Sequence, residues 1–111
     1  CEEKMGLFNF LGAGTDINSG VSKYKADPQA VLLDVRTPPE YRSGHIEGSI
    51  NIPLDKISTI DKKIKDKNTP LYVYCQSGAR SRQAVSYLTQ AGFVKAENIG
   101  GISRYKGKAM R

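Results

Sequence analysis

Apolar residues along the chain fall into two kinds of pattern. Short unbroken apolar runs, rich in β-branched and aromatic side chains, predict buried strands. Longer segments place apolar side chains three or four positions apart, which predicts amphipathic helices. Strands are expected over 31–35, 50–52 and 71–74, with a short edge strand within 93–99. Helices are expected after Asp16, after Thr37 and over 54–65, 82–91 and 102–108.

Predicted strands and helices alternate from one end of this pattern to the other. Such alternation favours an α/β fold, with a mostly parallel central sheet and helices on both faces. Ligands of these sheets bind at the carboxyl ends of the strands. The residues that follow each strand are therefore the first place to look for chemistry.

The central stretch is 71–92, which reads LYVYCQSGARSRQAVSYLTQAG. A strand ends at Cys75, a short loop runs to Arg80, and a helix follows until Gly92, a residue suited to the left-handed turn that ends a helix. Unpaired N–H groups at a helix start favour negative charge, lower a thiol pKa and so produce a reactive thiolate. Cys75 is thus the candidate nucleophile, and the loop is a candidate anion site.

The neighbours of this cysteine support the same interpretation. Gly78 allows the backbone to curl, Ser77 and Ser81 offer hydroxyl groups, and Arg80 adds a cation that we expect to face solvent. A cysteine that merely packs at a strand end is the alternative, because free cysteine behaves as a small buried hydrophobe. The remaining candidate anion ligands are the loop amides, which include those of Gln76 and Ala79.

Three other polar features are interpreted as structural. Asp34 interrupts a buried strand and Arg36 follows it, so a hydrogen-bond network at the strand end is expected. Thr37 and Glu40 have the spacing of a capping box, with a proline at the first helical position. His45, the single histidine, lies in a compact connector, where we expect it to bond to the backbone.

Composition limits the classes of function. The 111 residues fit one domain, and the net charge of +6 suits solubility or attraction of anionic substrates. Basic residues are not interleaved with aromatic ones, so no nucleic-acid partner is expected. No apolar run is long enough for a membrane span. The cysteines, Cys1 and Cys75, indicate neither a disulfide framework nor a metal site.

A single internal cysteine suits a reducing compartment, and a cytoplasmic location is expected. Cys1 leaves an alternative open. If it is the first residue of a mature lipoprotein, the protein is lipid-anchored or exported. A remnant of processing ahead of Met5 is another origin for this residue.

Three segments together resemble the single-domain rhodanese, or thiosulfate sulfurtransferase-like, family: LLDVRTPPEYRSGHIEGSINIP, YVYCQSGARS and AGF…NIGGISRYKG. The resemblance runs from about 16 to 107. It implies a rhodanese-like domain over 15–111 after an N-terminal extension, 1–14, in which a small apolar cluster is expected. Tyr105 stands where many relatives carry Trp, and we expect this difference to affect packing only.

The resemblance also implies a chemistry. Cys75 would accept a sulfane sulfur as a persulfide from a small anionic donor such as thiosulfate. The loop amides of 76–80 would hold that sulfur and the anion. Cyanide, a small thiol or a protein thiol, such as a thioredoxin-like partner, would be the acceptor. No metal or organic cofactor is required, and the segments around Asp34 and His45 would support the fold.

Two alternatives remain open from the sequence. Phosphatases and arsenate reductases of the same fold have Cys-x5-Arg, whereas Cys75 and Arg80 form Cys-x4-Arg, which predicts a smaller loop that suits sulfur better than phosphate. The other alternative is a module that relays sulfur to a protein partner, with little turnover of small molecules.

Overall fold

The computed structural model describes residues 15–111 of the chain. Its elements are, in order, α2 (Ile17–Ala26), β2 (Val31–Asp34), α3 (Pro38–Ser43), β3 (Ile50–Asn51), the 3₁₀ helix η1 (Leu54–Thr59), α4 (Ile60–Lys63), β4 (Leu71–Cys75), α5 (Ala79–Gln90), β5 (Ala96–Gly101) and the 3₁₀ helix η2 (Ile102–Arg104). The four strands form one sheet in the order β3-β2-β4-β5, and every neighbouring pair is parallel. The predicted α/β class is confirmed.

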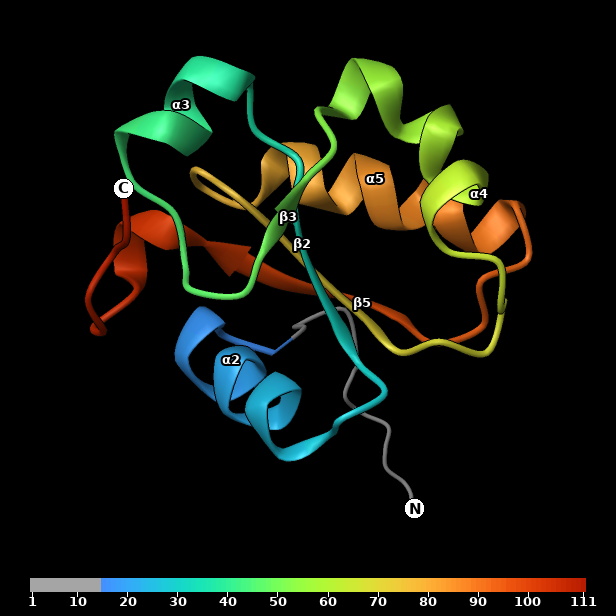
Figure 1. Ribbon diagram of the computed structural model, residues 1–111, viewed down its shortest axis with the longest axis horizontal. Coiled ribbons are helices and arrows are strands. Elements are labelled where there is room, and N and C mark those ends of the chain that lie inside the picture. Colours follow the sequence, from blue (N-terminus) through green and yellow to red (C-terminus); the bar gives the residue numbers. More distant parts are fainter. Residues whose placement is uncertain (1–14) are drawn as a thin grey trace.

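Helices cover both faces of the sheet, with α2 on one face and α4 and α5 on the other (Figure 1). Side chains alternate between the two faces along each strand. Leu32 and Tyr74 therefore pack with α2, whereas Leu33, Val73 and Cys75 pack with α5 and the segment that contains η1 and α4. Cys75, the candidate nucleophile, thus lies in the larger of the two apolar layers, with its sulfur toward the start of α5.

The helix starts follow the sequence closely. Asp16 caps α2 by accepting hydrogen bonds from the amides of Asn18 and Ser19. Thr37 and Glu40 form the predicted capping box on α3, with a proline in the first turn. Both caps satisfy backbone N–H groups that the first turn of a helix leaves unpaired.

Several element boundaries differ from those predicted. The segment 54–65 is a 3₁₀ helix followed by one turn of α-helix rather than a single helix, although Ile57, Ile60 and Ile64 are buried as expected. Residues 93–94 lie outside β5, and the last helix is only the short η2. The apolar cluster expected within 1–14 lies outside the described residues.

Candidate active site

The segment from β4 to α5 folds into a tight turn over the cysteine. β4 ends at Cys75, and α5 already begins at Ala79, three residues earlier than the predicted start at Arg82. Gly78 makes this possible because it precedes the helix with φ of 107°, a left-handed conformation that favours glycine. Ala79, Arg80 and Ser81 therefore belong to the first turn of the helix rather than to a loop.

Cys75 is buried, and its sulfur receives hydrogen bonds from that turn. The side chain is 1% exposed, and the amide of Gly78 donates to Sγ across 2.9 Å. Burial raises the pKa of the Cys75 thiol, but the Ser81 hydroxyl and the amides of Ser81, Gly78 and Ser77 lower it, and the net pKa lies below the ordinary value. These donors thus favour the thiolate of Cys75 relative to that of a free cysteine.

Ser81 links the sulfur to the neighbouring strand. Its buried Oγ lies 3.4 Å from Cys75 Sγ, 2.7 Å from Asn98 Oδ1 and 3.0 Å from the Gly78 carbonyl. Asn98 Oδ1 also accepts from the amide of Gly100. The single proton of the Ser81 hydroxyl therefore has three acceptors within reach, which are Asn98 Oδ1, the Gly78 carbonyl and the sulfur. Asn98 could not be predicted from the sequence, because a lone Asn in an edge strand carries no recognisable pattern.

Gly101 is a second residue at the site whose role was not predicted from the sequence. It lies in β5, as does Gly100. A Cβ on Gly101 would stand 2.3 Å from the Gln76 carbonyl oxygen and 2.6 Å from Ser77 Cα. This glycine lets the loop pass directly over β5. A glycine inside a strand often marks such a close backbone approach, and that was the available indication.

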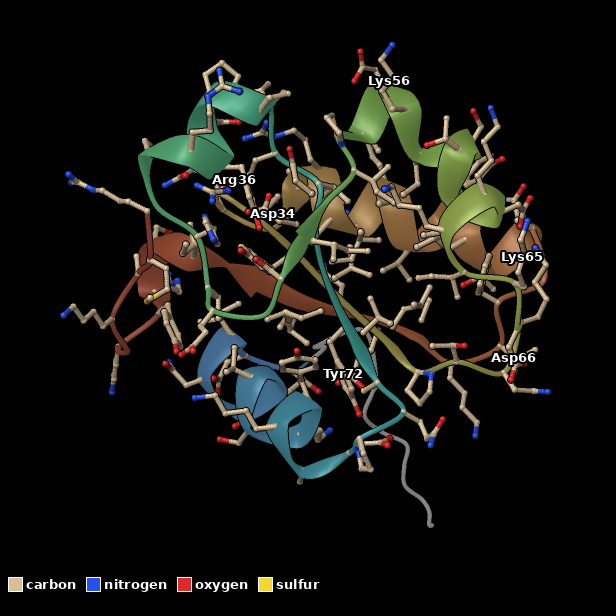
Figure 2. All side chains as sticks on the ribbon, viewed as in Figure 1. Asp34, Arg36, Lys56, Lys65, Asp66 and Tyr72 are labelled. Carbon is tan, nitrogen blue, oxygen red and sulfur yellow. The ribbon has the colours of Figure 1, made fainter. Side chains whose placement is uncertain are left out.

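The predicted network at the end of β2 is present beneath the loop, and Figure 2 shows Asp34 and Arg36 side by side below α3. Arg36 Nη2 lies 2.7 Å from Asp34 Oδ2 and donates to the Gly44 carbonyl across 2.6 Å. Arg36 Nη1 reaches Gln76 Oε1 at 3.4 Å. Asn51 Nδ2 donates to the carbonyls of Asp34 and Arg36. The network thus fixes the carboxyl ends of β2 and β3 against one end of the loop.

Arg80 differs from its prediction. It was expected to face solvent as an unpaired cation, but its guanidinium binds both carboxylate oxygens of Glu40, at 2.8 and 3.0 Å. The hydrogen bonds from Arg80, joined by those from Thr37, lower the pKa of Glu40 to about 2. Arg80 is therefore half-buried and largely neutralised. A bidentate pair across two helices joins positions 40 residues apart, which sequence spacing does not reveal.

His45 and its segment have the structural role expected of them. His45 Nδ1 lies 3.0 Å from the Tyr41 carbonyl oxygen, and the two rings stack with centroids 3.8 Å apart. The backbone of His45 also pairs with that of Met110. Further along, the amide of Ile46 donates to the Tyr74 hydroxyl, which in turn donates to Ser49. None of these contacts reaches Cys75.

The remaining loop residues surround the sulfur without contributing side chains to it. Gln76 is exposed at the surface, with its carbonyl accepting from the Ser103 amide, and Ser77 and Ala79 are exposed. Within residues 15–111, no group of three or more His, Cys, Asp or Glu side chains could hold a metal ion. In the same part of the chain, no helix is long and apolar enough to cross a membrane.

The chain is similar to several known proteins. The rhodanese-like domain family matches residues 19–108. Thiosulfate sulfurtransferase PspE of Escherichia coli is 41% identical over 71 residues, which cover 63% of this chain and 68% of that protein. A sulfurtransferase of Allochromatium vinosum is 39% identical over 87 residues, covering 77% and 80%. The relatives also include tRNA uridine(34) hydroxylases, such as that of Enterobacter, of which this chain spans only 26%.

Among solved structures, a rhodanese with anions from Escherichia coli superposes with a TM-score of 0.69 and 35% identity, over 74% of this chain and 98% of that one. Because the family match spans most of the chain, and because named sulfurtransferases are among its relatives, the resemblance seen in the sequence is confirmed: the chain belongs to the rhodanese-like family.

Proposed function

We propose that the protein is a sulfurtransferase in which Cys75 carries a sulfane sulfur as a persulfide. The observation that carries the proposal is the buried sulfur of Cys75, which accepts a hydrogen bond from the Gly78 amide at the start of α5. A thiolate stabilised in this way is a nucleophile that needs no general base. The substrates proposed are a small anionic donor, such as thiosulfate, and a thiophilic acceptor.

In the first step, the Cys75 thiolate attacks the outer sulfur of thiosulfate. The S–S bond of the donor breaks, its electron pair leaves with sulfite, and the new Cys75 S–S bond carries the negative charge as a persulfide anion. The amides of Ser77, Gly78 and Ser81, which lower the pKa of the thiol, would then donate to the terminal sulfur. Fixed N–H groups of this kind stabilise an anion without having to reorganise.

In the second step, cyanide or a thiolate attacks the terminal sulfur of the persulfide. The S–S bond breaks and Cys75 leaves as the thiolate, which regenerates the starting state. A protein thiol, such as that of a thioredoxin-like partner, is one proposed acceptor. No step calls for a metal or an organic cofactor.

The position of Arg80 supports sulfur transfer over phosphate chemistry. A phosphatase loop uses its arginine to hold the phosphoryl oxygens, whereas Arg80 is held by Glu40 across α3 and α5. The short Cys-x4-Arg spacing also favours sulfur, because it makes a smaller loop than the Cys-x5-Arg of the phosphatases.

We also assign the domain to 15–111 and an extension to 1–14. A cytoplasmic location stays a prediction from the sequence.

The persulfide is tested by intact-mass measurement after incubation with thiosulfate. We expect a gain of one sulfur atom, which cyanide or dithiothreitol removes and which Cys75→Ala does not form. The matched control is Cys1→Ser, which keeps the adduct. If the parent shows no adduct, or if Cys75→Ala retains it, the proposal is wrong. An adduct that passes to a protein thiol but not to cyanide would favour the relay alternative.

The Ser81 hydroxyl gives a second test, because it lies 3.4 Å from the sulfur. Ser81→Ala removes a hydrogen bond to a charged group, worth about 1.5 kcal/mol at the low end, so the pKa of Cys75 should rise by about one unit. The measurement is the rate of iodoacetamide alkylation against pH. Ser77→Ala is the matched control, because the Ser77 side chain is exposed. This variant keeps the backbone amide, so the pH midpoint of alkylation should not change. An unchanged midpoint in Ser81→Ala would refute this role.

A further inference from the structure

A basic segment of the chain lies against the loop that follows Cys75. Residues 98–111 contain four basic residues and no acidic one, in a chain whose net charge is +6. All four side chains are exposed, and they are Arg104, Lys106, Lys108 and Arg111. Within the described residues 15–111, none of them forms an ion pair. We call these four residues the 104–111 patch.

Backbone contacts place this patch beside the candidate active site. The Ser103 amide donates to the Gln76 carbonyl across 3.2 Å, so the segment leaves β5 at the loop itself. Further along, the backbones of His45 and Met110 exchange two hydrogen bonds, of 2.8 and 2.7 Å. The segment therefore runs from the loop to the connector after α3. Figure 1 shows it in red, on the side of the molecule where the loop after β4 lies.

The other lysine-rich surface differs in both charge and position. Residues 55–67 mix five lysines with three aspartates. The Lys67 carbonyl accepts from the amide of Val94, beyond the end of α5, so this surface lies at the far end of that helix from Cys75. Figure 2 shows Lys65 and Asp66 there, on the opposite side of the molecule from the loop. It offers an internal control for any effect of charge.

The composition of the 104–111 patch favours an acidic protein over a nucleic acid. Tyr105, the one aromatic residue of 98–111, packs against the buried cluster under α2, so it does not present a free face on which a base could stack. Met110 is 40% exposed, and methionine is enriched at protein interfaces. Cations around an apolar contact are complementary to a protein surface that carries carboxylates.

We propose that the 104–111 patch docks the protein that accepts sulfur from Cys75, and that acidic residues surround the reactive thiol of this partner. The inference rests on the proposed persulfide and adds a recognition surface for the second step. Because Cys75 is 1% exposed, the partner must approach at the exposed loop residues Gln76 and Ser77, next to the patch.

The transfer itself balances without a further reactant. The partner's thiolate attacks the outer sulfur of the Cys75 persulfide and forms a new S–S bond. The S–S bond of the enzyme persulfide breaks, and its electron pair stays with Cys75 as the thiolate. The partner leaves as a persulfide anion.

Single-turnover transfer tests the preference for charge. The enzyme is loaded with thiosulfate, freed of excess donor and mixed with peptides in which glutamates, glutamines or lysines flank one cysteine. Flanking charge shifts the pKa of the peptide thiol, so each rate constant is divided by that of the same peptide with a small neutral disulfide. We expect the glutamate peptide to react about tenfold faster than the lysine peptide at low salt, and about twofold faster at about 0.5 M salt.

The two levels of the proposal fail in different ways. Equal corrected rates for the three peptides, measured with a loaded enzyme, overturn the docking surface alone. An enzyme that takes up no sulfur from thiosulfate overturns the sulfur transfer beneath it.

Paired variants locate the effect within the molecule. Lys106→Glu combined with Lys108→Glu should lower the ratio of the glutamate to the lysine peptide to about one or below. Lys62→Glu combined with Lys63→Glu is the matched control, because it makes the same change of charge at exposed positions of the other surface, and it should stay near the parent ratio. Equal losses in the two double variants would assign the preference to net charge and overturn the patch. If the first double variant does not fold, the peptide series of the parent decides.

A binding experiment distinguishes a protein partner from RNA. A labelled glutamate peptide with serine in place of its cysteine is compared, by fluorescence anisotropy, with a labelled single-stranded RNA of equal charge. We expect the peptide to bind the parent at least as tightly as the RNA, and Lys106→Glu with Lys108→Glu to weaken its binding several-fold. Tighter binding of the RNA, lost in the same double variant, would make the patch an RNA site and overturn the proposal.

Discussion

Two arginine–carboxylate pairs flank the candidate active site, and they differ in burial and in what they join. Arg36 and Asp34 are two residues apart at the end of β2, and their side chains are 3% and 0% exposed. Arg80 and Glu40 come from α5 and α3, and their side chains are 33% and 34% exposed. Both pairs lie within reach of the loop, since Arg36 contacts Gln76 and Arg80 belongs to the helix start.

The two pairs therefore have different physical consequences. A buried pair is costly to break, because the remaining partner is left as an unpaired charge away from water. A half-exposed pair is weakened by solvent and contributes little to stability. Its charges nevertheless act on the anion site next to it. We infer that the Asp34–Arg36 pair holds the strand ends on which the loop rests. The Glu40–Arg80 pair sets the charge beside the sulfur.

The largest expected effect is on stability. Asp34→Ala leaves Arg36 buried without its carboxylate, and we expect the free energy of unfolding to fall by about 3–5 kcal/mol. Urea unfolding monitored by circular dichroism measures this loss. The matched variant is Glu40→Gln, which keeps a capping-box residue on α3 and should cost less than about 1 kcal/mol. Equal losses in the two variants would contradict the distinction between the pairs.

The next effect is on catalysis, and the two partners of the surface pair should change it in opposite directions. Glu40→Gln releases the Arg80 cation beside the anion site, so kcat/KM for thiosulfate should rise two- to tenfold, with a steeper dependence on ionic strength. Arg80→Ala removes the cation and should lower kcat/KM by up to about tenfold, a difference of roughly 1.4 kcal/mol.

Steady-state rates between low and high salt measure both changes. Val94→Ala is a suitable control, because its side chain is exposed and uncharged. If Glu40→Gln lowers kcat/KM as Arg80→Ala does, the pair acts through the position of the Arg80 side chain. In that case Glu40 does not moderate its charge.

The sequence predicted the elements whose signals are local. The caps at Asp16 and Thr37 and the left-handed Gly92 each depend on a few neighbouring residues, and each is present in the structure. The break at Thr59 was missed, because the inward spacing of isoleucines is compatible both with one helix and with a 3₁₀ turn followed by an α-turn. Periodicity fixes which side chains are buried better than it fixes the hydrogen-bond pattern.

Only the part of the candidate site that comes from one continuous segment could be predicted from the sequence. Cys75, Gly78 and Ser81 come from one segment, where a strand followed by a helix start already indicates an anion site. Glu40 and Asn98 reach that segment from elsewhere, through contacts that span 40 and 17 residues. Such contacts depend on tertiary packing, and single-sequence patterns carry no record of them. The prediction that Arg80 faces solvent was wrong for this reason.

The smallest expected effect is a dependence of stability on pH that is specific to the surface pair. The bond to Arg80 lowers the pKa of Glu40 to about 2 in the folded protein, against an ordinary value of about 4.3 when unfolded. A lowered pKa stabilises the fold fully above the unfolded value, and this stability is lost as the pH falls toward about 2. Because Glu40 is half-exposed, the contribution should stay below about 1 kcal/mol.

The measurement is the difference in urea unfolding free energy between the parent and Glu40→Gln, taken at pH 6 and at pH 3. Other carboxylates titrate in both proteins and cancel in that difference, which should shrink at pH 3. A difference that grows on acidification would mean that the carboxylate of Glu40 is not stabilised by Arg80 in solution.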